Sequence, residues 1–362
     1  MDQIQKKRIL GIDVARAIAV AGMIIVNFKV VFGETGDSWL KPFANFFFGK
    51  AAAVFVVLAG IGLAMMTNKA VEMQDLEKLK TAQKKIFKRA IFLFIVGLSY
   101  SWIWPADILH FYGVYMCLTL FFINRPTKQL FIAAVSIILV FPILVLFLDY
   151  NKGWIFEIWH YTDFWTLNGF FRNLLFNGFH PVVPWLSFMF FGLWYGRQNL
   201  YDETFLKKSF KISLAVFLST QALTIGLSQW IYSRNAKPNE FLQHLFGTAP
   251  MPPLPFYMIN GISVAIVLIS TCILIANKYE NNWLIRALNR TGQLALTFYV
   301  AHVVIGMGVM ADEDSAKFGK YSIDFSVTYA LTFSLLCIVF ANIWLRFRKS
   351  GPLEWLMRKL TD

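Results

Sequence analysis

The chain has 362 residues, of which 57% are hydrophobic and 15% are charged, and its mean hydropathy is +0.55. A soluble domain of this length would be far more polar. The net charge of +13 does not indicate nucleic-acid binding, because the basic residues are distributed as in a membrane protein.

Apolar runs of about 18 residues or more recur along the chain, which is typical of a polytopic α-helical membrane protein. The three cysteines lie inside such runs without metal-ligand spacing, so we interpret them as core residues and expect no metal site. The predicted fold class is all-α, with one domain over residues 1–362. We expect about ten transmembrane helices, at roughly 10–32, 43–66, 87–104, 107–123, 129–149, 182–196, 209–232, 255–277, 292–310 and 324–345.

The lysine and arginine residues predict the orientation of the chain. With the N-terminus in the cytoplasm, the cytoplasmic segments hold 24 of the 34 Lys and Arg residues and the outer segments hold eight. Basic residues are in excess on the cytoplasmic side of membrane proteins. We therefore expect both termini in the cytoplasm, and we interpret the first apolar stretch as a retained span rather than a cleaved signal peptide.

The first span carries three polar residues, Asp13, Arg16 and Asn27. Charged side chains inside a membrane are costly, and helical geometry places these three positions on one face. A purely structural interpretation is an Asp–Arg pair and an Asn that hold the bundle together. We favour a polar wall that faces a substrate cavity, because three polar groups on one face exceed what packing needs.

Lys50 lies near the outer end of the second span. Its long side chain could extend to the membrane surface and keep the ammonium group in water, or the ammonium could bind an acidic group of a substrate. Of the connecting segments, we expect 68–86 to form a short charged cytoplasmic helix that anchors the topology. We expect 150–181, rich in Trp and Phe, to form interfacial helices that cover a cavity.

Asp107 and His110 begin the fourth span, three residues apart. This spacing puts both on one helical face within hydrogen-bond reach. A carboxylate that holds an imidazole raises its basicity and fixes its tautomer, as general-base catalysis requires. Asp107 is also a good helix cap, with His110 then filling the interface, and the two interpretations are compatible.

A second histidine, His180, lies between Phe179 and Pro181 at an outer membrane boundary, with Trp185 shortly after it. Such a rigid loop could hold a side chain at the mouth of a cavity. The alternative is interfacial anchoring by His and Trp.

The ninth span carries a polar stripe of Gln293, Thr297, Tyr299 and His302. Their spacings of three and four residues predict hydrogen bonds along the helix. The stripe could bind a substrate, or it could join neighbouring helices by hydrogen bonds.

These stretches resemble a known family. Arg8-Ile-Leu-Gly-Ile-Asp13-Val-Ala-Arg16, ending in Val26-Asn27, resembles the first span of the transmembrane acyltransferase superfamily, and in particular of its YeiB-like family. The same family resemblance extends over essentially the whole chain, through Asp107-Ile-Leu-His110-Phe-Tyr-Gly, His180-Pro-Val-Val-Pro-Trp185, Gly292-Gln-Leu-Ala-Leu-Thr297 and Gly351-Pro-Leu-Glu-Trp.

More distant relatives are the heparan-glucosaminide N-acetyltransferases and the enzymes that O-acetylate bacterial polysaccharides. The O-acetylating relatives have a histidine where this chain has Asn27, whereas the heparan enzymes have an asparagine there. The heparan enzymes also use a histidine in the loop just beyond, and residues 28–42 contain none. The resemblance therefore leaves His110 or His180 to act as the base, or implies that activity has been lost.

The resemblance implies an acyltransferase of the bacterial inner membrane that moves an acyl group, acetyl above all, from cytoplasmic acyl-CoA to a sugar or lipid at the outer face. Arg16 would lie near the CoA phosphates, Asn27 would polarise the thioester carbonyl, and His110, oriented by Asp107, or else His180, would deprotonate the acceptor. Acyl-CoA is then a co-substrate rather than a tightly bound cofactor, and membrane lipids and the acceptor are the other partners. A further set of residues is expected to contact substrate: Asp13, Arg16, Lys50, Trp185, Gln293, Tyr299 and His302.

Two other classes of protein fit the same residues. A transporter or flippase for a small anion or a lipid would use the intramembrane Asp, Arg and His as substrate and proton sites. A ligand-binding membrane protein without catalysis is the third class. The acceptor and the formation of a homodimer are left open by the sequence.

Overall fold

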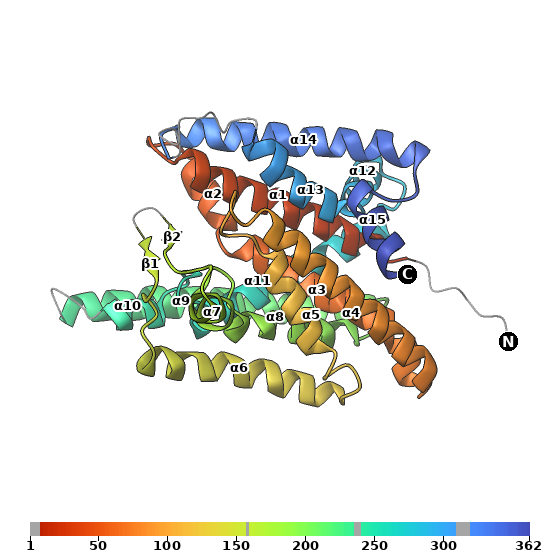
Figure 1. Ribbon diagram of the computed structural model, residues 1–362, viewed down its shortest axis with the longest axis horizontal. Coiled ribbons are helices and arrows are strands. Elements are labelled where there is room, and N and C mark those ends of the chain that lie inside the picture. Colours follow the sequence, from red (N-terminus) through yellow and green to blue (C-terminus); the bar gives the residue numbers. More distant parts are fainter. Residues whose placement is uncertain (1–7, 157–158, 235–239, 309–318) are drawn as a thin grey trace. The chain divides into compact units, whose positions relative to one another are not determined.

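The computed structural model describes residues 8–156, 159–234, 240–308 and 319–362, and Figure 1 labels its elements. Nearly all of the regular structure in these ranges is helical, which confirms an all-α membrane protein; the exception is one pair of two-residue strands. The α-helices are α1 Leu10–Phe32, α2 Leu40–Phe47, α3 Lys50–Glu72, α4 Leu76–Ser99, α5 Leu109–Thr119, α6 Thr127–Phe147, α7 Leu167–Arg172, α8 Val182–Gly196, α9 Glu203–Arg234, α10 Glu240–Phe246, α11 Pro255–Lys278, α12 Trp283–Gly292, α13 Ala295–Ala301, α14 Ile323–Phe347 and α15 Pro352–Thr361. Two π-helical turns, η2 Asn173–Asn177 and η3 His302–Met307, and the strands β1 Trp154–Ile155 and β2 His160–Tyr161 complete the set.

Six stretches of helix in the described residues are long and apolar enough to cross a membrane: Leu10–Phe32, Leu40–Glu72, Thr127–Phe147, Glu203–Arg234, Pro255–Lys278 and Ile323–Phe347. Leu167–Asn177 and Val182–Gly196, bent by 48° at a short break, would make a seventh. Two further apolar helices, Leu109–Phe122 and Ala295–Met307, are shorter. Elements therefore occur at all ten predicted positions, but the count of ten spans stays a prediction.

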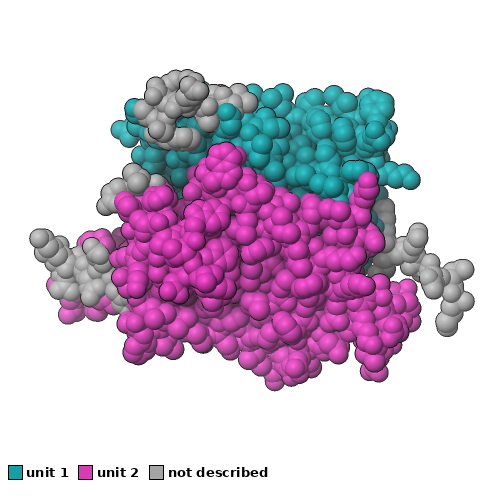
Figure 2. All heavy atoms as spheres, in the orientation of Figure 1, with its two compact units in different colours: residues 1–51, 199–212, 266–356 teal, residues 52–198, 213–265, 357–362 magenta. Residues whose placement is uncertain are grey.

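The chain forms two compact units, neither of them continuous in sequence, which Figure 2 distinguishes by colour. Unit 1 comprises residues 1–51, 199–212 and 266–356. Within it α1 packs against α12 and α14, and α12 packs against α14 (Figure 1). Close approach depends on glycine, because a Cβ at Gly292 would overlap the backbone carbonyl of Asp13 on α1.

Unit 2 comprises residues 52–198, 213–265 and 357–362. Here α4 packs on α5 and α6 packs on α8. The α4–α5 contact again needs glycines: a Cβ at Gly113 would lie 2.5 Å from the carbonyl oxygen of Ala90, and one at Gly97 would lie 2.5 Å from the carboxylate of Asp107. Small residues that let helix backbones meet are typical of helix contacts in membranes.

Two connecting segments differ from their predictions. Residues 68–86 do not form a separate short helix: α3 runs on to Glu72, and α4 begins at Leu76, where the Asp75 carboxylate caps it by accepting from the backbone N–H of Lys78 at 3.0 Å. The charged stretch and the apolar stretch after it are therefore one helix, because helical propensity does not end at the membrane surface.

The described part of 150–181 is only partly helical, and it contains the β1–β2 pair. The buried side chain of Asn177 holds this segment together. Its Nδ2 donates to the carbonyls of Tyr150 and Lys152, each at 2.8 Å, and its Oδ1 accepts from the Tyr161 hydroxyl at 2.7 Å. Side-chain bonds to backbone carbonyls satisfy groups that a helix would otherwise pair, so the segment can be buried without being helical.

The predicted span 292–310 is also interrupted, and its last residues lie outside the described ranges. Because α12 ends at Gly292 and α13 begins at Ala295, Gln293 and Thr297 do not bond to each other. Gln293 Nε2 instead donates to Asn289 Oδ1 at 2.8 Å. Thr297 donates from its hydroxyl at 2.6 Å and from its backbone N–H at 3.0 Å to the Glu354 carboxylate of α15.

Burial raises the pKa of the Glu354 carboxyl, and the two hydrogen bonds from Thr297 offset part of this rise. A carboxyl whose pKa is raised on folding contributes stability below its unfolded pKa, and that contribution is lost as the pH rises through the folded pKa. We expect the melting temperature of the wild type to rise relative to that of Glu354→Gln as the pH is lowered from about 7 to about 5. Thermal unfolding of both proteins at the two pH values measures this, and a difference that does not depend on pH would contradict it.

Candidate functional site

Asp13 is the centre of a charged cluster at the start of α1. The residue is 2% exposed, and its carboxylate accepts from Arg8 Nε at 2.7 Å and from Arg16 Nη1 at 2.8 Å. Asn289 of α12 lies 3.5 Å from the same carboxylate and 3.4 Å from the carbonyl of Leu10. The predicted Asp13–Arg16 pair is present, and since two arginines serve one buried carboxylate, the cluster keeps a positive charge.

Asn27, at the far end of α1, contacts a histidine that is distant in the sequence. Its Nδ2 lies 2.9 Å from Nε2 of His302, which is fully buried. His302 Nδ1 bonds to the backbone carbonyl of Tyr299, which can only accept, so Nδ1 carries the proton. The Nε2 lone pair of His302 therefore accepts from the Asn27 amide, and the two side chains form one polar pair in unit 1.

In unit 2, Asp107 and His110 form the predicted dyad, and both are buried. His110 Nδ1 lies 3.2 Å from Asp107 Oδ2, and the other carboxylate oxygen accepts from the Tyr100 hydroxyl at 2.6 Å. Asp107 Oδ2 also accepts from the backbone N–H of His110 at 3.2 Å, so it caps the helix as well. The carboxylate fixes the proton on Nδ1 and leaves Nε2 as a basic lone pair.

Several buried polar atoms near this dyad have no hydrogen-bond partner among the described residues, including His110 Nε2, His180 Nδ1 and Trp185 Nε1. His180 and Trp185 are in edge-to-face contact at 4.5 Å between ring centroids, and His180 lies 6.0 Å from Phe111, the residue after His110. The His180 backbone carbonyl accepts from the Tyr115 hydroxyl. Buried polar atoms are normally paired, so orphaned nitrogens on three neighbouring side chains indicate a place for a polar group that the chain itself does not supply.

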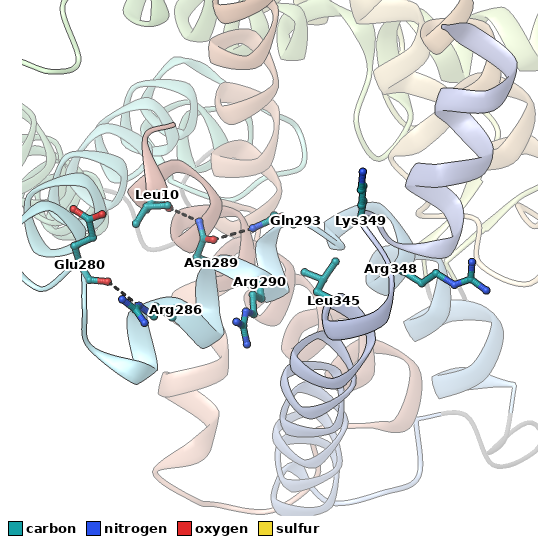
Figure 3. A pocket seen from close by; sticks show the side chains of 9 residues that line it. All are labelled: Leu10, Glu280, Arg286, Asn289, Arg290, Gln293, Leu345, Arg348 and Lys349. Atoms are coloured by element: carbon teal, nitrogen blue, oxygen red, sulfur yellow. Dashed lines mark hydrogen bonds between the residues drawn. The ribbon is translucent and has the colours of Figure 1, made fainter. Parts of the chain in front are cut away.

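The remaining predicted residues lie elsewhere. Lys50 lies over the ring of Phe46 at 5.5 Å, a cation–π contact that explains its position without a substrate. Tyr299 is buried and touches His302 through its ring at 5.0 Å and through its carbonyl. Gln293 lines a cavity at the end of α12, shown in Figure 3.

Two supporting residues are absent from the sequence-based prediction. Tyr100, on the other carboxylate oxygen of Asp107, lies seven residues before it, at the end of α4. Asn289 reaches Asp13 across 276 positions. The first could have been found as a phenol close to an acidic residue at a helix end, whereas nothing in the sequence indicates the second.

Gly97→Ala is expected to disturb the dyad without removing either of its residues. The added Cβ would lie 2.5 Å from Asp107 Oδ2 and would overlap the backbone nitrogen of His110, so α4 and α5 must move apart. Overpacking of this kind costs about 1–3 kcal/mol. Gly226→Ala is the matched control, since nothing lies within 4 Å of a Cβ there on α9. Thermal unfolding should show a clear loss for Gly97→Ala and none for Gly226→Ala, and equal behaviour of the two would contradict the close α4–α5 contact.

Apolar helices long enough to span a membrane, together with buried polar pairs on or beside apolar helices, define a multi-pass membrane protein with buried polar sites. The chain belongs to the family of heparan-alpha-glucosaminide N-acetyltransferase catalytic domains, whose family model matches residues 8–231. This range contains Asn27, Asp107, His110 and His180, but not His302.

A second family model, described as "Protein of unknown function (DUF418)", matches residues 195–362; this is the YeiB-like family. A similar protein along the whole chain is "Uncharacterized protein YxaH" of Bacillus subtilis (strain 168). It is 22% identical over an alignment of 403 residues, which covers 98% of this chain and 94% of that protein. The predicted membership of a YeiB-like, acyltransferase-related family is confirmed.

Proposed function

We propose that the protein is a membrane-embedded acyltransferase that moves an acyl group from acyl-CoA to a hydroxyl or amine of a sugar or lipid acceptor. The observation that carries this proposal is the buried Asp107–His110 dyad, with its orphaned Nε2, inside the region that matches the N-acetyltransferase family. A general base needs a lone pair, a fixed tautomer and a place for the proton donor next to it. His110 supplies the lone pair, Asp107 fixes the tautomer, and the unpaired nitrogens of His180 and Trp185 mark the place.

In the proposed reaction, His110 Nε2 takes the proton of the acceptor as its oxygen or nitrogen attacks the acyl carbonyl. The new acyl–oxygen or acyl–nitrogen bond forms, the carbon–sulfur bond of the thioester breaks, and the proton leaves with the CoA thiol. Asp107 stabilises the imidazolium that forms in between, and Tyr100 holds Asp107 in place.

We propose ten spans with both termini in the cytoplasm of a bacterium, and the inner membrane as the location. The distribution of Lys and Arg supports this orientation. It puts the Arg8–Asp13–Arg16 cluster on the cytoplasmic side, where acyl-CoA is made, and Asn27 toward the outer half of the membrane.

The test is transfer of a radiolabelled acetyl group from acetyl-CoA by the purified protein in nanodiscs, with bacterial lipid and glycan extracts as acceptors. Label that enters acceptor material with the wild type but not with His110→Gln supports the proposal. Proton-driven uptake of an anion into vesicles, together with an intact thioester in every extract, would overturn it in favour of a transporter.

A further inference from the structure

A cavity of about 530 Å³ lies at the end of unit 1 that the charge distribution assigns to the cytoplasm. Figure 3 shows its lining: Leu10 from α1, Glu280 before α12, Arg286, Asn289, Arg290 and Gln293 on or just after α12, and Leu345, Arg348 and Lys349 at the end of α14. Ligand sites typically have volumes of about 300–1,000 Å³, so the cavity is large enough for a ligand of nucleotide size.

Four of the nine lining residues are cations, against one carboxylate, Glu280. Arg286 donates to the backbone carbonyl of Glu280 at 3.4 Å and to Asn281 Oδ1 at 2.6 Å, and Arg290 donates to Asn342 Oδ1 at 3.3 Å. These neutral acceptors orient the two guanidinium groups without neutralising them. In the described residues, no ion pair joins Arg286, Arg290, Arg348 or Lys349 to a carboxylate.

Basic residues at a cytoplasmic surface often serve only to set the topology. Two features separate these four from an ordinary surface. They come from two different helices that converge on one cavity, and hydrogen bonds fix the side chains at the bottom of this cavity. Buried Asn289 bonds to Gln293, to the carbonyl of Leu10 and to Asp13, so α12 is fixed to α1 at this point.

A smaller neighbouring cavity of about 170 Å³ shares Leu10 and Glu280 with the first and is lined by Arg8. Arg8 shares the Asp13 carboxylate with Arg16, so one positive charge remains in that cluster. The larger cavity, with four cations and one carboxylate, therefore holds more of the uncompensated positive charge. Arginine recognises phosphate by paired N–H donors, and charge-assisted bonds of this kind are about twice as strong as neutral ones.

We propose that this cavity binds the phosphate groups of the acyl donor, the phosphorylated end of CoA; naming this donor rests on the proposed function. Several cations around one hollow suit a ligand with several negative charges better than a single carboxylate. The same helix α1 that forms a wall of the cavity at Leu10 carries Asn27 seventeen residues further on, roughly 26 Å along the helix axis.

The test measures binding of CoA, 3′-dephospho-CoA and pantetheine to the whole protein in nanodiscs of uncharged phosphatidylcholine. The main variant is Arg348→Gln with Lys349→Gln, because both side chains are exposed and make no described contact. The matched control is Lys208→Gln with Lys211→Gln, which removes two exposed cations elsewhere in unit 1. Arg286→Gln is a second variant in the cavity.

We expect the wild type to bind CoA more tightly than 3′-dephospho-CoA, and pantetheine least. Each cavity variant should weaken CoA binding about tenfold or more, with little change for pantetheine, and the control pair should bind as the wild type does. Equal affinity for CoA and pantetheine, or an equal loss in the cavity variants and the control pair, would overturn the proposal. Folding of each variant is checked by its melting temperature, and the two cavity variants give independent readings.

Anionic lipid headgroups carry the same phosphate chemistry, so the measurement is repeated in nanodiscs that contain phosphatidylglycerol. Suppose that the wild type no longer binds CoA in these nanodiscs, while phosphatidylglycerol has no effect on the cavity variants. This result would assign the cavity to a lipid headgroup and overturn the donor assignment. The outcome also separates the two proposals. CoA binding that depends on the cavity supports this inference even if no transfer is found, and transfer by variants with unchanged CoA binding supports the function while overturning this inference.

Discussion

Replacement of His110 by Gln should lower the rate of acyl transfer by a factor of about 10²–10⁴, which is the usual contribution of a general base. Gln fills a similar volume and can still reach Asp107, but it has no basic lone pair. The melting temperature should therefore stay close to that of the wild type while the transfer rate falls. Asp107→Asn should also lower the rate, because an amide can no longer fix the proton on His110 Nδ1.

Two other histidines make this experiment specific. His160 is exposed on β2, so His160→Gln should leave transfer unchanged and is the matched control. His302→Gln tests the rival arrangement, in which the histidine beside Asn27 is the base. If His302→Gln abolishes transfer and His110→Gln does not, the base lies in unit 1 and the role assigned here to Asp107 and His110 is wrong.

The Asp107–His110 dyad could be predicted because both residues lie in one helical turn, where spacing alone decides whether side chains meet. The Asp13–Arg16 pair was predictable for the same reason. The contact between Asn27 and His302 was not, since it joins helices 275 positions apart and depends on how α1 and α13 pack. In the polar stripe of the ninth span, Tyr299 and His302 do bond, but the pairing of Gln293 with Thr297 was wrong. Periodicity assumes an unbroken helix, and α12 ends where Gly292 lets it meet the backbone of α1.

The basic cavity is a second feature that the sequence alone could not predict. Four cations line it: Arg286, Arg290, Arg348 and Lys349. In the sequence they lie in two predicted cytoplasmic segments, 278–290 and the residues after 345, and contribute only to the count of charges that sets the topology. Their convergence on one hollow becomes visible only when α12 and α14 are placed side by side. Sequence patterns thus predicted the class of fold and the local pairs, while groups assembled from several helices needed the structure.

Asp13→Asn should destabilise the protein by on the order of 2–3 kcal/mol. Breaking a fully buried ion pair by removing one partner costs about 3–5 kcal/mol. The expected loss is smaller here because the side chains of Arg8 and Arg16 are 55% and 29% exposed, so water can solvate both guanidinium groups when the carboxylate is gone. Thermal or denaturant unfolding of the purified protein measures the change.

Glu203→Gln is the matched control for Asp13→Asn, because Glu203 forms a surface pair with Lys207 at 2.6 Å and its side chain is 65% exposed. Such a pair contributes about 0–1 kcal/mol, so this variant should unfold close to the wild type. A third variant combines Asp13→Asn with Arg16→Gln. If the cost of Asp13→Asn comes from unpaired positive charge, the double variant should be more stable than the sum of the two single losses predicts. Additive losses would instead show that Asp13 acts mainly through Arg8, which lies just before α1, and Asn289, which joins α12 to α1.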